Sequence, residues 1–106
     1  MGVEVMLSIT EIQSKLFPLF DGLDVKRAIL FGSYARNQET LESDIDLVID
    51  SEMRGLDFIG VKIDVEEILG RSVDLIPERS IDKTHQIYRN ILNEGVIIYE
   101  QNKADR

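Results

Sequence analysis

Two aspartates lie two residues apart in a segment where acidic and aliphatic residues alternate. Asp44 and Asp46 alternate with Ile45 and Leu47. Residues two apart in a β-strand point to the same side, so the pattern predicts a half-buried strand with both carboxylates on one face. Two negative charges that close repel each other, and each resists ionisation. Two divalent cations with oxygen ligands would relieve this repulsion, and Mg²⁺ is the usual ion where phosphates are present.

A third aspartate lies in another segment that is typical of a strand. Asp74 is at the centre of residues 72–76, which are followed by Pro77. If this strand neighbours the strand of Asp44 and Asp46, three carboxylates share one face. Three carboxylates around two metal ions can stabilise the attacking and the leaving oxygen of a displacement at phosphorus. The alternative interpretation is that the aspartates only solvate the open face of an edge strand.

A glycine and a serine follow the apolar segment 25–31, which is typical of a buried strand. Gly32 allows the backbone to approach a ligand closely, and the exposed amides with the Ser33 hydroxyl form an anion site suited to triphosphate oxygens. The alternative is an ordinary helix N-cap. Arg36, about one turn further on, has two open interpretations. It contacts phosphate, or it pairs with one of the aspartates and holds the loop.

The elements that must position these residues alternate along the chain. Capping and periodicity predict helices at 8–20, at 56–69 and from a cap at Ser80 to just before Gly95, a short helix or loop at 32–37, and strands at 25–31, 44–50, 72–76 and 96–99. Pro18 is expected to kink or end the first helix. The connection 37–43 is too short for a full parallel crossover unless it is mostly helix. We therefore expect an α/β (α+β) fold with a mixed sheet of about four strands, the first two antiparallel, flanked by helices.

Length and composition limit the possible classes of protein. The 106 residues fit a single domain, residues 1–106, with 100–106 as a frayed tail. Twelve basic and 20 acidic residues give a net charge of −8, which argues against extended nucleic-acid binding. The absence of cysteine excludes disulfides and thiolate metal sites. Residues 1–6 do not resemble a signal peptide, and no apolar run approaches a membrane span, so we expect no membrane partner and a cytoplasmic location.

The combined motif carries a resemblance to a known family. Gly32-Ser33, ten intervening residues and Asp44-x-Asp46 resemble the signature of polymerase-β-type nucleotidyltransferases. The strings LFGSYAR and SDIDLV resemble the small single-domain members, the minimal nucleotidyltransferases (MNT), often the antitoxins of HEPN/MNT toxin–antitoxin pairs. The similarity extends to the closing segment 94–99. One departure is Asn37, where many relatives have glycine, and asparagine tolerates a left-handed backbone better than most residues.

The resemblance implies a polymerase-β-like fold, a function and a set of site residues. The implied reaction is the Mg²⁺-dependent transfer of AMP from ATP, with two ions, to a tyrosine hydroxyl of a HEPN ribonuclease toxin, which is thereby inactivated. By matching position, Asp44 and Asp46 hold the metal ions. Asp74 is a third catalytic and metal-binding carboxylate that helps to activate the acceptor. Gly32, Ser33 and Arg36 bind the nucleotide.

Two rival functions remain open. In the first, the chain is a non-catalytic antitoxin that neutralises its partner by binding. In the second, it is a nucleotidyltransferase that acts on a small molecule or an RNA end. The chain is short for a separate acceptor-binding domain, so we expect a partner protein and an exposed apolar flank including residues such as Phe17, Phe20 or Ile59. We expect His85 to face solvent on its helix, and Tyr34 to pack beside the strand rather than stack on a base.

Overall fold

The computed structural model describes residues 7–36 and 44–101. Its elements are α1 (Ile9–Asp21), β1 (Val25–Phe31), β2 (Ile45–Ser51), α2 (Leu56–Leu69), β3 (Val73–Pro77), the short 3₁₀ helix η1 (Glu78–Ser80), α3 (Gln86–Glu94) and β4 (Val96–Glu100). The strands form one sheet in the order β3-β2-β1-β4. Strand β1 runs antiparallel to β2 and β4, and β2 runs parallel to β3. The predicted mixed sheet with antiparallel first strands is confirmed. No helix of the described ranges is long and apolar enough to cross a membrane.

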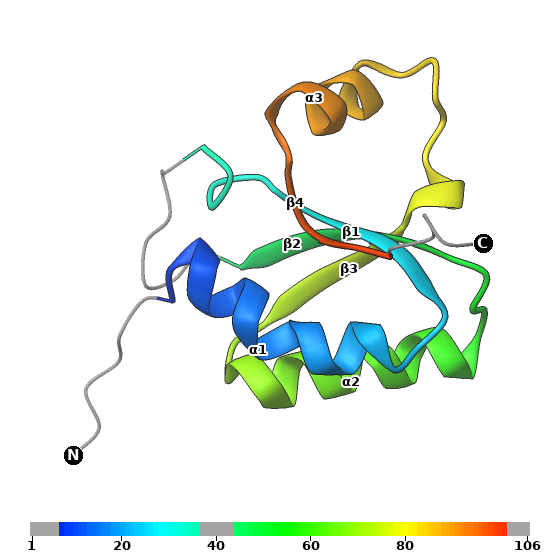
Figure 1. Ribbon diagram of the computed structural model, residues 1–106. Coiled ribbons are helices and arrows are strands. Elements are labelled where there is room, and N and C mark those ends of the chain that lie inside the picture. The colour runs from blue at the N-terminus through cyan, green and yellow to red at the C-terminus, as the bar shows by residue number, and fades with distance from the viewer. Residues whose placement is uncertain (1–6, 37–43, 102–106) are drawn as a thin grey trace.

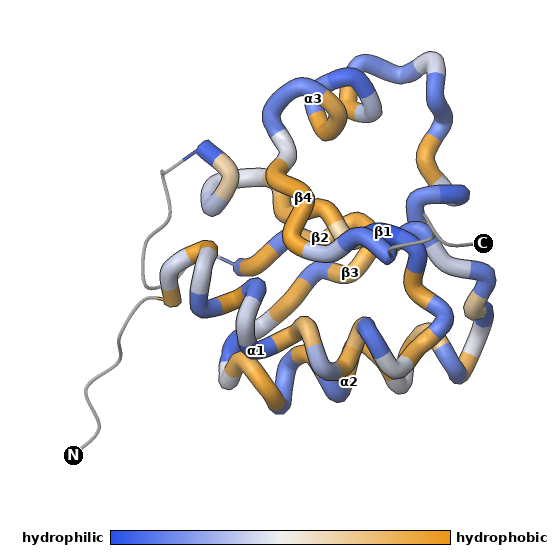
Figure 2. The backbone as a smooth tube through the Cα atoms, viewed as in Figure 1, coloured by the Kyte–Doolittle hydropathy of each residue, from blue (hydrophilic) through white to orange (hydrophobic). Residues whose placement is uncertain are grey.

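The helices cover the two faces of the sheet unequally. Helices α1 and α2 lie side by side on one face, and α3 lies over the other (Figure 1). The larger core fills the space under α1 and α2. A smaller apolar cluster of Ile29, Val48 and Ile91 lies between the sheet and α3. Because apolar residues pack on both faces of the sheet, the strands consist mostly of hydrophobic residues (Figure 2). Strand β2 is therefore buried on both faces over most of its length, and this places its aspartates beside a packed interior.

Helix α1 begins as its sequence predicts and ends later. Glu11 donates its backbone N–H to Ser8 Oγ at 3.0 Å, and Glu11 Oε1 accepts the Ser8 N–H at 2.8 Å. This reciprocal capping box is confirmed. Pro18, however, lies inside the helix, which continues to Asp21. The fully buried side chain of Phe20 anchors this last turn in the core, in spite of the backbone donor that proline removes. The prediction that Phe20 belongs to an exposed flank is therefore wrong.

Helix α2 has the predicted bounds and ends at Gly70, which adopts the left-handed conformation with φ +66°. Val61, Val65 and Leu69 face the core. Helical spacing in the sequence predicts that Ile68 belongs to the same inner stripe, and this prediction is only partly correct because Ile68 is 39% exposed. Apolar side chains on the outer side of α2, such as Ile59, are half exposed as well. The helix therefore has apolar residues on both its inner and its outer sides.

The predicted helix that starts at Ser80 is wrong in its first third. Ser80 belongs to η1, and its hydroxyl donates to the Pro77 carbonyl at 2.7 Å. Asp82 Oδ1 then accepts both the backbone N–H and the hydroxyl of Thr84, at 2.9 and 2.7 Å. Such local side-chain bonds compete with helical ones and favour turns. The polar loop before α3 results from these bonds.

Helix α3 instead begins at Gln86, and the N-cap is His85, whose Nδ1 accepts the Ile87 N–H at 3.1 Å. His85 is exposed, as predicted, but it precedes the helix rather than lying on it. For a helix capped at Ser80, helical spacing in the sequence predicts an inner face that includes Thr84 and Leu92, and this prediction is wrong because both are exposed. Within α3, Ile91 is the buried residue, so α3 is anchored mainly through this side chain.

The C-terminal end is more ordered than expected. Glu100 is the last residue of β4, and the Gln101 N–H donates to the Lys26 carbonyl at 2.9 Å. The prediction of a frayed tail is wrong for these two residues, because pairing with β1 supplies their backbone partners. The rest of that predicted tail, 102–106, lies outside the described residues, as do residues 1–6 and 37–43, which include Asn37.

Candidate active site

Two of the three predicted aspartates are paired across neighbouring strands. In the parallel register of β2 and β3, Asp46 is the partner of Asp74. Both carboxylates therefore lie on the same face of the sheet. Asp44 immediately precedes β2 and is exposed. The structure thus brings Asp46 and Asp74 together and places Asp44 at the entrance to the same strand.

The turn after β1 closes over Asp46. Phe31, the last residue of β1, is the register partner of Asp46, and Gly32 follows with φ +76°. A Cβ added to Gly32 would overlap the Oδ2 atom of Asp46. The position therefore requires glycine twice, for its backbone conformation and for the space that the carboxylate occupies. The sequence predicts that a ligand approaches the Gly32 backbone closely. In the structure the Asp46 side chain is the group that lies close to it.

The Gly32 to Arg36 segment is a turn and not a helix. The Arg36 N–H lies within 3.2 Å of both the Gly32 and the Ser33 carbonyl oxygens. Ser33 is half-buried within this turn. Of the two predicted alternatives for this segment, the described part therefore corresponds to the loop.

The negative charges of the site are incompletely balanced. Burial raises the pKa of half-buried Asp46, and the neighbouring charges of Asp74 and Asp44 raise it further, while Arg36 acts in the opposite direction. A carboxylate in this position gains from a bound cation. A metal ion bound at this position would therefore stabilise the ionised form of Asp46.

The aspartates do not form a closed metal cage. Among the residues that the structure describes, no group of three or more His, Cys, Asp or Glu side chains converges closely enough to hold a metal ion. Mg²⁺ in enzymes is usually held by one or two carboxylates, and substrate phosphates and water supply its other oxygens. Asp46 with Asp74, and Asp44 beside them, fit this open kind of site.

Arg36 has a partner that the sequence does not indicate. Its Nη1 lies 3.5 Å from Glu94 Oε1 at the end of α3, and both side chains are 49% exposed. This pair with Glu94 leaves the predicted pairing of Arg36 with an aspartate a prediction, and the Arg36 charge does act on Asp46 by lowering its pKa. An exposed pair of this kind contributes little to stability, so a phosphate group can compete for the guanidinium. Phosphate contact by Arg36 stays a prediction.

Tyr34 and Arg71 connect the turn to the start of β3. Tyr34 is 1% exposed, and its hydroxyl accepts a hydrogen bond from Arg71 Nη1 at 3.1 Å. The prediction that Tyr34 packs beside the strand is confirmed. Because Arg71 lies three residues before Asp74, this contact ties the Gly32 turn to the strand that carries the third aspartate.

A second contact fixes the register of β3. Glu66 Oε2 accepts the Val73 N–H at 3.0 Å and a bond from Lys62 Nζ at 3.1 Å. The Val73 bond is the main cause that lowers the pKa of Glu66, followed by Lys62. The Ile45 N–H donates to the Ser72 carbonyl at 3.1 Å. Glu66 has the helical spacing of an ordinary solvated residue in the sequence, but in the structure it helps to place β3 beside β2.

A pocket of about 250 Å³ opens next to the turn, between β1 and α3. Its lining consists of Phe31, Gly32, Arg36, Ile87, Asn90, Ile91 and Glu94. Gly32 and Arg36 belong both to this pocket and to the predicted phosphate site. The sequence did not indicate the α3 residues of this lining, because their proximity depends on how α3 packs over the sheet.

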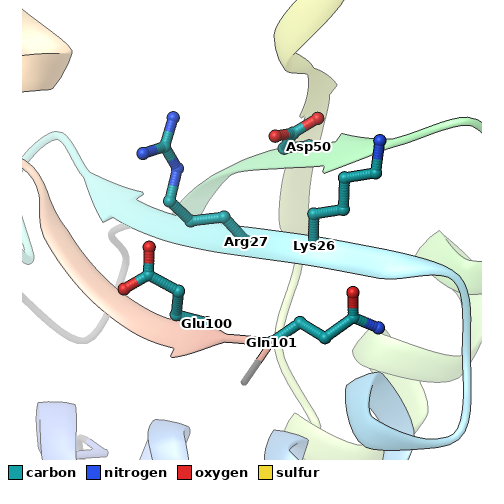
Figure 3. A pocket seen from close by; sticks show the side chains of 5 residues that line it. All are labelled: Lys26, Arg27, Asp50, Glu100 and Gln101. Atoms are coloured by element: carbon teal, nitrogen blue, oxygen red, sulfur yellow. The ribbon is translucent and has the colours of Figure 1, made fainter. Parts of the chain in front are cut away.

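A hollow of similar size, about 260 Å³, lies at the other end of β1. Figure 3 shows Lys26 and Arg27 on β1, flanked by Asp50 and by the residues at the end of β4. Arg27 Nη2 pairs with Glu78 Oε1 at 3.2 Å, and this bond with the surrounding carboxylates raises the Arg27 pKa although burial alone would lower it. Because its charges compensate one another and it is distant from Gly32, we assign it no part in the site.

Comparison with known proteins agrees with this architecture. The family model "Polymerase beta, Nucleotidyltransferase" matches residues 14–104. A Methanocaldococcus jannaschii protein named "Putative protein adenylyltransferase MJ0435" is 41% identical over 93 residues, which cover 85% of this chain and 97% of that protein. Protein adenylyltransferase MntA of Thermococcus cleftensis is 32% identical over 99 residues, which cover 88% of this chain and 98% of MntA. The match therefore spans nearly the full length of both relatives.

A solved structure with this fold is a complex of a tri-AMPylated Shewanella oneidensis HEPN toxin with its MNT antitoxin. The superposition has a TM-score of 0.66 at 18% identity and covers 88% of this chain and 73% of the matched chain. At that identity the likeness shows the fold alone. The family match and the near full-length relatives show more than the fold. The chain belongs to the polymerase β nucleotidyltransferase family, and it is a nucleotidyltransferase with the MNT fold.

Proposed function

We propose that this protein is a single-domain, Mg²⁺-dependent protein adenylyltransferase. It transfers AMP from ATP to a tyrosine hydroxyl of a HEPN ribonuclease toxin and acts as the antitoxin of that toxin. The observation that carries the proposal is the register pair of Asp46 and Asp74 beside the Gly32 turn. The names of the two relatives and the AMPylated toxin in the matched complex support the choice of a protein acceptor.

The proposed reaction is a displacement at the α-phosphorus of ATP. The acceptor oxygen forms a bond to this phosphorus while the bond to the bridging oxygen of the β-phosphate breaks. The products are an AMP ester of the acceptor and pyrophosphate. The hydroxyl proton leaves towards a carboxylate, and exposed Asp74 on edge strand β3 is the carboxylate that a second protein can reach.

The protein residues supply positioning and charge. Asp44 and Asp46, with Asp74, are the residues that would hold Mg²⁺, which supplies charge neutralisation at the phosphates when bound. The Gly32 and Ser33 amides and the Ser33 hydroxyl face the leaving phosphates, and Arg36 adds a positive charge. Phosphoryl transfer depends mainly on such positioning and electrostatic stabilisation, so this small set of groups is sufficient for the chemistry.

The acceptor would come from a separate protein. Exposed apolar side chains lie on the adjacent helices α1 and α2, where Phe17 is 52% and Ile59 is 51% exposed. Because α1 and α2 cover the sheet face opposite Asp46 and Asp74, a partner that covers these residues would also have to reach around edge strand β3 to present its tyrosine at Asp74. The net charge of −8 favours a basic partner surface.

The intact mass of a co-expressed HEPN partner tests this function. With wild-type protein, Mg²⁺ and ATP, the partner should gain the mass of one or more AMP groups, and Asp46→Asn should remove the gain. Asp64→Asn, an exposed acidic residue in the middle of α2, is the matched control and should behave as wild type. A partner that is silenced at unchanged mass would show a binding antitoxin instead. Labelled AMP found only on RNA or a small molecule would show another acceptor.

A further inference from the structure

The pocket between β1 and α3 has a lining that is unlike a phosphate site. Phe31, Ile87 and Ile91 supply apolar surface, and Asn90 supplies a neutral amide. Glu94 adds a carboxylate at the same pocket, already paired with Arg36 at 3.5 Å. A carboxylate on the wall disfavours negatively charged phosphates inside the pocket. The part of a ligand that enters it is therefore uncharged and flat enough to lie against aliphatic and aromatic side chains.

The pocket is continuous with the phosphate turn. Gly32 and Arg36 line it, and Gly32 also contacts the Asp46 side chain at the catalytic carboxylates. At about 250 Å³ it is smaller than the roughly 300–1,000 Å³ of sites that enclose a drug-sized ligand. It can therefore enclose one part of a nucleotide. A triphosphate bound along the Gly32 turn leaves the nucleoside part as the only uncharged portion of the donor.

Asn90 gives the pocket a polar group that can pair with a base. Gln86 Nε2 donates to Asn90 Oδ1 at 3.0 Å, one turn apart on α3, and this bond holds the amide in position. The Asn90 NH₂ group still has donors to offer. Ring nitrogens and carbonyl oxygens of nucleobases are acceptors, and side-chain amides are common partners of base edges. Ile87, which is 47% exposed, lies one turn before Ile91 on the same wall.

We propose that this pocket is the nucleobase subsite of the donor nucleotide, with Asn90 as the base-reading residue and Ile87 as an apolar wall against the base. The inference rests on the proposed function, since it names where the donor of that reaction binds. Gln86 is a positioning residue that acts through Asn90. The triphosphate stays outside the pocket, at Gly32, Ser33 and the aspartates.

The test compares two ligands that share phosphates but differ in the base. Isothermal titration calorimetry with Mg²⁺ measures Kd for ATP and for inorganic tripolyphosphate. Asn90→Ala and Ile87→Ala should each weaken ATP about 3- to 10-fold, which corresponds to one net hydrogen bond or a comparable apolar contact, and should leave tripolyphosphate unchanged. Asn93→Ala and Leu92→Ala change an asparagine and an aliphatic residue on α3 outside the pocket lining, and both should match wild type.

The outcomes separate this inference from the proposed function. If wild type binds ATP and both pocket variants bind it equally well, the base lies elsewhere and the inference is overturned alone. If the variants weaken ATP and tripolyphosphate by the same factor, the pocket holds phosphate, which also overturns it. If wild type binds no ATP, the proposed function fails and the inference fails with it. Because Asn90 is exposed, Asn90→Ala is expected to fold. It keeps the test decisive even if Ile87→Ala weakens the packing of α3 against the sheet.

Discussion

Gly32 and Asp46 share a space that holds either a carboxylate or a Cβ but not both. The Gly32 backbone has φ +76°, and an added Cβ would overlap Oδ2 of Asp46. The turn that is proposed to bind phosphate and the carboxylate that is proposed to bind metal are therefore placed against each other. A side chain added at Gly32 would therefore displace the Asp46 carboxylate.

Replacing Gly32 should separate an effect on activity from an effect on stability. Gly32→Ala should lower the transfer rate about 100-fold, because displacing a reacting group by about 1 Å costs that much. Gly70→Ala is the matched control, since Gly70 also has positive φ but open space around an added Cβ. Both variants should lose about 1–2 kcal/mol of unfolding free energy, measured by urea denaturation. Equal activity of Gly32→Ala and Gly70→Ala would contradict the proposed contact.

The charge on Asp46 should destabilise the metal-free protein at neutral pH. Its pKa is raised in the folded state, so protonated Asp46 contributes stability at pH values below its unfolded pKa, and this contribution is lost as pH rises through the folded pKa. Asp46→Asn should therefore raise the melting temperature by a few degrees at pH 7 in EDTA, with little gain near pH 3. Calorimetric scans across this range, with Asp64→Asn alongside, measure the difference. A uniform shift at every pH would have another cause.

Arg36 should lower the pKa of Asp46. Its positive charge opposes the effects of burial and of the two other aspartates, so Arg36→Gln should raise the Asp46 pKa further. Carboxyl-detected NMR titration of the metal-free protein follows this group directly. Arg89→Gln removes an equal charge from the exposed side of α3 and should leave the Asp46 titration unchanged. Identical titration curves for the two variants would show that Arg36 does not act on Asp46.

The bond between Arg71 and Tyr34 should matter for both stability and catalysis. Tyr34→Phe keeps the buried ring but removes the hydroxyl, and the loss should be about 0.5–1.5 kcal/mol of unfolding free energy. Because the bond ties the Gly32 turn to β3, kcat for AMP transfer should fall as well. Tyr88→Phe on α3, far from this bond in the sequence, should change neither quantity. If Tyr34→Phe is as stable as wild type and has normal kcat, the bond between Arg71 and Tyr34 contributes neither to stability nor to the position of the Gly32 turn.

The local parts of the site could be predicted from the sequence, because they depend on short spacings. Alternation around Asp46 predicted the strand, whereas the predicted approach of the Gly32 backbone to a ligand stays a prediction, and the structure shows its approach to Asp46. The pairing of Asp46 with Asp74 could only be stated as a condition. It depends on α2 returning the chain in parallel to β2, and a shift of one residue would move Asp74 to the other face.

The long-range contacts could not be predicted. Arg71, Glu66 and Glu94 lie on helices or loops whose spacing is that of ordinary solvated residues, and their partners are far away in the sequence. The start of α3 was missed for a local reason. Asp82 bonds to Thr84 in a turn, and this arrangement competes with the helix that a Ser80 cap would begin.

The position of β3 gives the protein a kinetic property. In the described part of the chain β3 has a strand neighbour, β2, on one side only. The backbone N–H and C=O groups on its other side therefore have no partner in a second strand. Edge segments of this kind open more often than central strands, and their amide hydrogens exchange faster. Each opening of β3 would carry Asp74 away from Asp46. The exchange rate of the β3 amides therefore reports how often Asp74 separates from Asp46.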